Sequence, residues 1–189
     1  MKTANWIKGL VLATGVASLS GCGTINAIGN LEEGAGGTFM EVWDKWVNAE
    51  GDIAEATMWE MKVKDGVKLE DVKDAINSVA TNRNIKNVGE LPLSEELKAR
   101  GIKSGVIHVM SFCNPETARK MLDFSPAMGG FLPCRVNIVE KADGLYIYSM
   151  NMDMMVKMGK KLPPDLKAAA VDVRNTMWEM MEKGSKGEF

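Results

Sequence analysis

The sequence has a single histidine, His108, among its 189 residues. Hydrolytic Ser/His/Asp triads and zinc sites built from several imidazoles both need histidine, so one histidine leaves almost no room for either class. Phosphate-binding loops, HExxH helices and EF-hand loops are missing from the sequence, as is the CxxCH motif of covalent haem attachment. These absences favour a protein without catalytic activity and indicate no reaction type.

The sequence also lacks a cluster of basic residues. It has 23 lysines and arginines against 25 aspartates and glutamates, which gives a formal net charge of −2. Proteins that bind nucleic acids carry concentrated positive charge that neutralises phosphates. We therefore predict that no nucleic acid is a partner.

The first residues have the pattern of a secretory signal. Residues 1–21 hold two lysines, no acidic residue and a short apolar run at 9–17, which is too short to persist as a spanning helix. Leu19–Cys22 resembles the bacterial lipobox, in which the cysteine is lipidated and becomes the new N-terminus. The next residue is Gly23, and similarity to Gram-negative lipoproteins makes this typical of sorting to the outer membrane. We predict an outer-membrane lipoprotein of the bacterial cell envelope, on the periplasmic side, with Cys22 as its lipidation site.

Removing residues 1–21 from 189 leaves 168, enough for one domain with a hydrophobic core. Because the removed segment carries two lysines, the formal net charge becomes −4. We divide the rest into a flexible glycine-rich tether (22–37), an N-terminal amphipathic helix (38–56), a folded domain (57–184) and a short tail (185–189).

Hydrophobic periodicity within the folded domain predicts both strands and helices. Residues 59–63 alternate between apolar and charged side chains as a half-exposed strand, and residues 69–80 place their apolar side chains on one helical face. Ala142-Asp143-Gly144 predicts a hairpin turn between two more strands. Pro163-Pro164 starts a final helix, and Gly184 predicts its end.

A stripe of large apolar residues marks the N-terminal helix. Its members recur at helical spacing and are Phe39, Val42, Trp43, Trp46 and Val47. The two tryptophans have three possible contacts: the sheet of the domain, the bilayer, or a partner protein. Docking onto the sheet is the prediction that we favour.

The first of the two central cysteines lies between a strand and a helix. Residues 106–113 are apolar at nearly every position, which predicts a strand buried on both faces. Asn114 suits a helix N-cap and Pro115 suits the first helical position. Cys113 would then lie at a helix N-terminus, where the helix dipole favours a thiolate.

The second cysteine opens the next strand. Gly129 and Gly130 predict a tight loop in which the backbone can approach a ligand closely, and Cys134 follows that loop. If the two strands are neighbours, the two thiols meet at the rim of the sheet. The candidate ligand or redox residues are therefore Cys113, Cys134, Asn114, Gly129 and Gly130.

These segments also carry a family resemblance. Cys113-Asn114-Pro115 and Gly130–Cys134, followed by Val136 and Val139-Glu140, resemble the core signature of the family called domain of unknown function 302. The resemblance extends from about Met58 to Glu182. It implies an α+β fold in one domain, with an antiparallel β-sheet packed on one face by amphipathic helices, and often a homodimer. It implies no activity.

A structural disulfide is the first of three chemical roles open to Cys113 and Cys134. The envelope is oxidising, and lipidation of Cys22 leaves an even number of thiols. Closing a loop of about 20 residues would stabilise the fold by about 3 kcal/mol in the chain-entropy account. A chain of this length does not need that cross-link, so the role stays open.

The second role is a soft-metal or haem site. Thiolates and thioethers select copper(I), and imidazole is a common ligand, which makes Cys113, Cys134, Met110 and His108 the candidates. A regular strand would turn His108 and Met110 away from Cys113, so the two cysteines are the better pair. The 15 methionines also have a simpler explanation, because methionine fills irregular gaps in cores.

The third role is a redox-active or reactive thiol at Cys113. A helix N-terminus supports activation of the thiol, but the sequence has no CxxC motif and offers only His108 as a base. A non-catalytic binding or assembly module needs none of this chemistry, and in it residues 127–132 and the cysteines would shape a ligand pocket or a dimer contact. We favour such a module, with a disulfide or a soft ligand site, over the copper, haem and thiol-redox alternatives. The sequence does not indicate the ligand.

Overall fold

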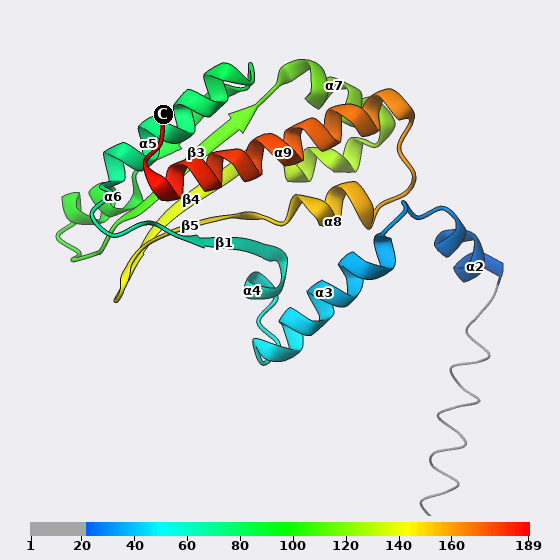
Figure 1. The fold of residues 1–189 in the computed structure, drawn as a ribbon, viewed down its shortest axis with the longest axis horizontal. Helices are drawn as coiled ribbons and strands as arrows, with labels where there is room; N and C mark the ends of the chain where they lie inside the picture. The colour runs from blue at the N-terminus through cyan, green and yellow to red at the C-terminus, as the bar shows by residue number, and fades with distance from the viewer. Residues whose placement is uncertain (1–21) are drawn as a thin grey trace, which may run out of the picture.

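The computed structural model describes residues 22–189, and the predicted signal peptide at 1–21 lies outside the described residues (Figure 1). The N-terminal half contains α2 (Cys22–Gly29), α3 (Ala35–Asn48), α4 (Ile53–Thr57), β1 (Met58–Lys62), α5 (Leu69–Asn82), β2 (Lys86–Leu91) and α6 (Leu93–Ala99). The C-terminal half contains β3 (Ile107–Cys113), α7 (Pro115–Phe124), the 3-10 helix η1 (Pro126–Phe131), β4 (Cys134–Lys141), β5 (Gly144–Met150), α8 (Met152–Lys157) and α9 (Pro164–Lys186).

Five antiparallel strands form one sheet in the order β1-β5-β4-β3-β2. Lys141 of β4 pairs with Gly144 of β5, which confirms the hairpin predicted at 142–144. At the edge of the sheet, the pairing of β2 with β3 changes register between Asn87 and Gly89. The antiparallel sheet with its helices confirms the predicted single-domain α+β fold.

Helices α5 and α9 lie side by side across one face of the sheet (Figure 1). Helix α5 forms because its apolar residues recur every three or four positions, so that one face can be buried. The core that this face closes is made of fully buried side chains from both helices and three strands: Val72, Ile76, Met110, Phe112, Val136, Ile138, Ile147, Met177, Met180 and Met181. Four of these ten residues are methionines, which supports the interpretation of methionine as a core-filling residue in this protein.

Strand β3 is buried on one face, so the prediction of burial on both faces was wrong. Along β3, His108, Met110 and Phe112 are buried, whereas the residues between them are only partly buried. The helices α5 and α9 cover the first set, and the alternate residues lie on the opposite face. A strand with apolar side chains on both faces does not reveal in its sequence that only one is covered.

Helix α9 continues past Gly184, which was predicted to end it, and Gly187 in the left-handed conformation ends it instead. Gly184 is buried where α9 meets α5 and the sheet. A Cβ atom there would lie 3.0 Å from Cγ1 of Ile76 and 3.1 Å from Cδ1 of Ile147. The glycine therefore allows close helix packing, and the predicted tail at 185–189 begins inside the helix with the buried Ser185.

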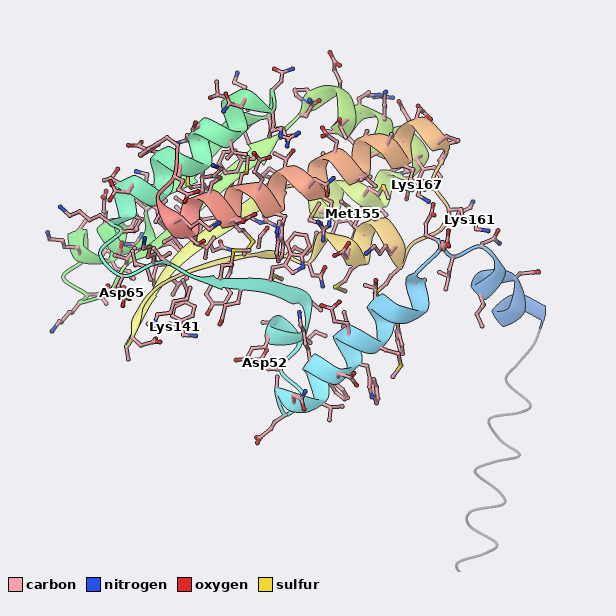
Figure 2. The ribbon with its side chains drawn as sticks, viewed as in Figure 1. Asp52, Asp65, Lys141, Met155, Lys161 and Lys167 are labelled. Atoms are coloured by element: carbon pink, nitrogen blue, oxygen red, sulfur yellow. The ribbon has the colours of Figure 1, made fainter. Side chains whose placement is uncertain are left out.

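The segment predicted as a flexible tether, 22–37, contains helix α2 and the start of α3, and its middle is fixed to the domain. Leu31 forms a β-bridge with Lys160. The buried Glu32 carboxylate accepts hydrogen bonds from the Leu162 backbone N–H at 2.9 Å and from Lys167 Nζ at 2.6 Å. Figure 2 shows Lys167 near the start of α9, beside the beginning of α3. The hydrogen bond from Lys167, followed by that from Leu162, lowers the pKa of Glu32.

We expect Glu32→Ala to release residues 22–57 while leaving the sheet folded, because the variant removes the charged acceptor of two hydrogen bonds. Hydrogen exchange of the amides in 30–48 should accelerate on the order of tenfold or more, with β3 and β4 unchanged. Glu33→Ala is the matched control, since the Glu33 side chain is exposed. Equal exchange in both variants would show that Glu32 does not hold the segment.

The N-terminal helix predicted at 38–56 is two helices. The chain breaks at Glu50 and Gly51, both with positive φ, and Asp52 then caps α4 by accepting a hydrogen bond from Ala54 N at 2.8 Å. The two tryptophans of α3 do not dock on the sheet as predicted. Trp43 and Trp46 are exposed and their rings contact each other, with centroids 5.3 Å apart.

Candidate functional site

The end of strand β3 builds one wall of the candidate site. Asn114 is the N-cap of α7, and its side-chain oxygen accepts hydrogen bonds from the backbone N–H groups of Glu116 and Thr117, each at 3.0 Å. Pro115 takes the first helical position, as predicted. These local preferences fix the turn that follows Cys113, the last residue of β3.

The start of strand β4 builds the opposite wall. Cys134 is the first residue of β4 and pairs with Phe112. Because Phe112 precedes Cys113, the two cysteines are neighbours across the β3–β4 ladder, although regular alternation would point them to opposite faces. Cys134 packs against the main core, and Cys113 lies where the chain leaves the sheet for α7.

Both cysteines line a single pocket between the sheet, α7, η1 and α9, which we call the cysteine pocket. The cavity measures about 20 Å³, enough for one water molecule or one ion. Its walls are mainly apolar and carry five sulfur-containing side chains, Cys113, Cys134, Met121, Met155 and Met177. The thiols of Cys113 and Cys134 are free, so the predicted disulfide is not formed in this structure.

The three methionines of the pocket were not among the predicted site residues. They come from α7, α8 and α9, so only the tertiary fold brings them together. Met155 belongs to the methionine-rich run at 150–158, which was a partial signal. Met121 and Met177 lie in helices whose sequences show only that methionine is an apolar residue there.

Burial raises the pKa of the Cys134 thiol to about 11, with a further increase from the negative charge that Cys113 would carry and a small decrease from Arg135. Two ionised sulfur atoms in one apolar pocket repel each other. Cys134 is therefore a protonated thiol at neutral pH, and any process that uses its thiolate must first remove a strongly held proton.

This high pKa predicts slow alkylation of Cys134. In a chain that begins at Gly23 and carries Cys113→Ser, Cys134 is the single thiol. Burial, the larger cause of the raised pKa, remains in this variant, whereas the contribution of the Cys113 charge is removed. Iodoacetamide should therefore react at pH 8 at least about tenfold more slowly than with an unperturbed thiol. The rate should keep rising with pH beyond the usual thiol pKa of 9.0. The alkylation rate is measured by mass spectrometry of samples quenched at set times. A rate that reaches a plateau near pH 9 would contradict the prediction.

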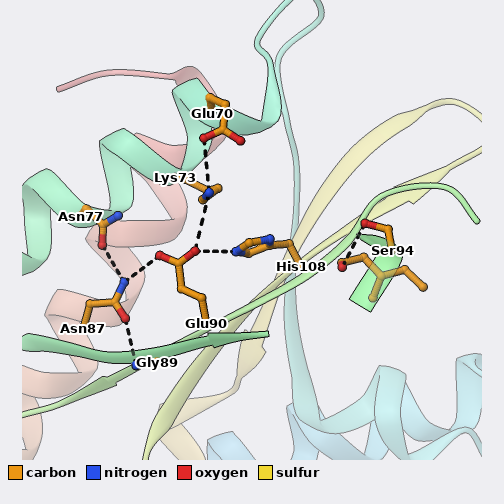
Figure 3. Close-up of polar contacts among 9 residues, drawn as sticks. Glu70, Lys73, Asn77, Asn87, Gly89, Glu90, Ser94 and His108 are labelled. Atoms are coloured by element: carbon orange, nitrogen blue, oxygen red, sulfur yellow. Dashed lines mark hydrogen bonds and ion pairs between the residues drawn. The ribbon is translucent and has the colours of Figure 1, made fainter. Parts of the chain in front are cut away.

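His108 and Met110, the other predicted metal ligands, do not line the cysteine pocket. Met110 is fully buried in the core. The Nε2 atom of His108 lies 2.7 Å from Oε2 of Glu90, which Lys73 and Asn87 also contact (Figure 3). Burial raises the pKa of Glu90. The hydrogen bonds from His108 and Asn87 and the charge of Lys73 together outweigh burial, so the pKa of Glu90 is lowered overall. The His108 side chain therefore pairs with a carboxylate of the neighbouring strand β2 and not with the two cysteines.

The two predicted loop glycines lie beside the pocket. Gly129 and Gly130 belong to the 3-10 helix η1, and neither has a positive φ. A Cβ at Gly129 would lie 3.2 Å from Cδ2 of Leu122, so this glycine lets η1 pack closely on α7. Gly130 lines a second cavity of about 150 Å³ that shares Phe131 and Cys134 with the cysteine pocket.

A wider groove of about 850 Å³ lies between α3, α4 and the uncovered sheet face. Three of its polar side chains contact one another: Tyr148 donates a hydrogen bond to Glu60 at 2.5 Å, and Lys141 Nζ lies 3.5 Å from the same carboxylate. These three groups therefore satisfy one another. Between residues 22 and 189, no cluster of three or more histidine, cysteine, aspartate or glutamate side chains is placed to hold a metal ion. None of the helices in that range is long and apolar enough to cross a membrane.

Comparison with known proteins agrees with this fold. Residues 59–184 match the family described as "Domain of unknown function DUF302". The crystal structure of an uncharacterised conserved DUF302 protein from Bacillus stearothermophilus is similar, with a TM-score of 0.55 and 18% sequence identity, and the match covers 67% of this chain and 97% of that one. At this identity the likeness shows the fold alone. No curated protein matches the chain by sequence.

Proposed function

The chain belongs to the family described as domain of unknown function DUF302, and because that description assigns no activity, we propose a function from the chain's own site. The protein is a non-catalytic, lipid-anchored envelope protein that binds a soft ligand in the cysteine pocket. Monovalent copper is the ligand whose chemistry fits that pocket best.

The meeting of five sulfur-containing side chains in one apolar cavity carries this proposal. Thiolates and thioethers are soft ligands that select copper(I) over hard, strongly hydrated cations. Carboxylate and imidazole ligands, which would favour zinc or magnesium, are not among the residues that line the pocket. The cavity of about 20 Å³ suits a single ion and does not admit a haem.

The charge of the pocket supports a monovalent ion. Burying an uncompensated charge in an apolar site costs several kcal/mol. One thiolate cancels the charge of one copper(I) ion, and neutral sulfur from the other side chains completes the ligand set. A divalent ion would need both thiolates to balance its charge, and its binding would also have to displace the proton that burial holds on Cys134.

The proposed location rests on the N-terminal sequence. The two lysines, the short apolar run and Leu19–Cys22 support export and lipidation at Cys22, with the domain on the periplasmic side of the outer membrane. A free thiol pair in an oxidising compartment needs protection or a ligand, and a copper(I) ion would provide it.

A disulfide between Cys113 and Cys134 is the second candidate. The pairing of Cys134 with Phe112 supports it, because this pairing makes Cys113 the next residue along the facing strand. Forming the bond would release two protons and transfer two electrons to an oxidised dithiol protein of the envelope. The protein would then be a scaffold or a thiol-redox carrier without a metal.

Anaerobic titration separates the two candidates. The chain from Gly23 onward is purified under reducing conditions, its thiols are counted, and copper(I) is added in competition with a chromogenic chelator. We expect two free thiols, one bound copper(I) per chain and loss of at least one thiol from the count on binding. Failure to compete with the chelator, together with two thiols that readily oxidise to a disulfide, would replace the copper proposal with the second candidate.

A further inference from the structure

Helix α3 has one face toward the domain and one face left open. On the inner face Thr38 is buried and Val42 and Lys45 are partly buried. The outer face carries large apolar side chains that are between 38% and 54% exposed, which we call the aromatic stripe: Phe39, Met40, Trp43, Trp46 and Val47. The rings of Phe39 and Trp43 are stacked, with centroids 6.5 Å apart.

The aromatic stripe is part of a wider concentration of exposed apolar residues near the N-terminus. Ile28 of α2 and Ile53 of α4 are each 64% exposed and flank the stripe in sequence. Seven of the thirteen exposed large hydrophobic residues between 26 and 189 therefore fall within Ile28–Ile53. Scattered single residues of this kind are normal, but a run of them on one helix face marks an interaction surface.

The position of α3 in the chain points to the partner. Leu31 is held against Lys160, so the body of the domain begins only nine positions after Cys22. Those residues span at most about 30 Å when extended, and less as helix α2. If Cys22 is lipidated, as the proposed function requires, the domain cannot move far from the bilayer. Figure 1 shows α3 apart from the sheet and on the same side of the molecule as α2.

We infer that the aromatic stripe of α3 lies in the interface of a phospholipid bilayer and orients the anchored domain on the membrane. This inference rests on the lipidation at Cys22 that belongs to the proposed function. Tryptophan rings favour the interface because they are apolar with one polar edge. An amphipathic helix with phenylalanine and tryptophan on one face and charged residues on the other can lie flat in that plane.

The charges of α3 indicate which kind of bilayer it contacts. The helix has two acidic residues, Glu41 and Asp44, against one basic residue, Lys45, which pairs with Glu41 at 3.1 Å. It therefore gains nothing from anionic headgroups, whose attraction needs lysine and arginine. Burial of apolar surface is the driving force, so a zwitterionic bilayer suffices and added salt should not weaken binding.

The test uses the chain from Gly23 onward without its lipid and vesicles of phosphatidylethanolamine and phosphatidylcholine. At lipid concentrations of about 1 mM we expect co-sedimentation and a blue shift of tryptophan emission. Phe39→Ser with Trp43→Ser should lower the vesicle-bound fraction at least about tenfold. The matched control is Leu91→Ser with Ile102→Ser, because these two residues are 48% and 51% exposed and lie on β2 and just after α6.

Three results would overturn the inference. The first is equal vesicle binding by the stripe variant and the wild type, and the second is no vesicle binding by the wild type. The third is a dimer in light scattering that the stripe variant abolishes without any vesicle binding, since the occupant would then be a second copy of the chain. Circular dichroism checks that both variants are folded.

Failure of the proposed function gives different signals. Absence of a diacylglycerol mass on Cys22 in protein extracted from cells removes the anchor, and absence of copper(I) binding removes the ligand. Neither measurement alters vesicle binding by the unlipidated chain, so failure of the proposed function is distinguished from failure of the aromatic stripe to bind a bilayer.

Discussion

Replacing Cys113 with serine and Cys134 with alanine together is expected to weaken copper(I) binding by at least about a hundredfold. Loss of residues that only support metal ligands costs tenfold to a hundredfold in affinity, and loss of both thiols should exceed that. Alanine is chosen at Cys134 because the site packs against the core, where an unpaired hydroxyl would be destabilising. Anaerobic competition titration measures the affinity.

The methionines provide an internal control for this prediction. Leucine replaces methionine with little change in volume, so it removes a thioether while keeping the packing. Met121→Leu, Met155→Leu and Met177→Leu in one chain should reduce copper(I) affinity about tenfold. Met110→Leu, at a fully buried position outside the pocket, should have no effect. If the double cysteine variant binds copper(I) with unchanged affinity, the cysteine pocket is not the copper(I) site.

Gly184→Leu is expected to have the largest effect on stability. Even a Cβ at this position would lie 3.0 Å from Ile76 and 3.1 Å from Ile147, and leucine adds three more carbon atoms between α9, α5 and the sheet. Gly184→Ala should lower the free energy of unfolding by up to about 2 kcal/mol, because a packing cost of about 1–3 kcal/mol is offset by about 1 kcal/mol of helix propensity. Leucine should lower it by more than about 3 kcal/mol, which corresponds to at least about 6 °C in Tm for a chain of this size.

Gly37→Ala is the control for the glycine substitution. It also replaces a helical glycine, but a Cβ at Gly37 meets no atom within 4 Å. Alanine has the higher helix propensity, so this variant should be neutral or more stable by up to about 1 kcal/mol. Urea unfolding followed by circular dichroism measures both. A Gly184→Ala variant as stable as the wild type would show that α9 can move away from α5 without cost.

Features that depend on local chemistry could be predicted from the sequence. Asn114 and Pro115 start a helix because a side-chain acceptor and a fixed φ act within one turn of the chain. The hairpin at 142–144 likewise depends on its own residues and on the alternation of the flanking strands. These local signals, with the family resemblance, were enough to predict the α+β fold and the neighbouring positions of the two cysteines.

Features that depend on tertiary contacts could not be predicted. Met121, Met155 and Met177 meet at the cysteine pocket because three helices converge there, and no periodicity within one helix reports that convergence. The apolar stripe of α3 has the same pattern whether it packs on a sheet or faces outward, which is why the docking prediction for Trp43 and Trp46 was wrong. Gly184 was read as a helix end because sequence alone does not distinguish a stop from a close contact between helices.

The register shift in β2 bears on how this protein avoids aggregation. A regular strand at the edge of a sheet offers its unpaired backbone groups to any other extended chain, which is how fibrils grow. The extra residue between Asn87 and Gly89 breaks the spacing of those groups. Lys86 and Glu90 add charge of both signs along the same six residues. Strand β2 is therefore a poor template for an incoming strand, which keeps copies of this protein from joining edge to edge.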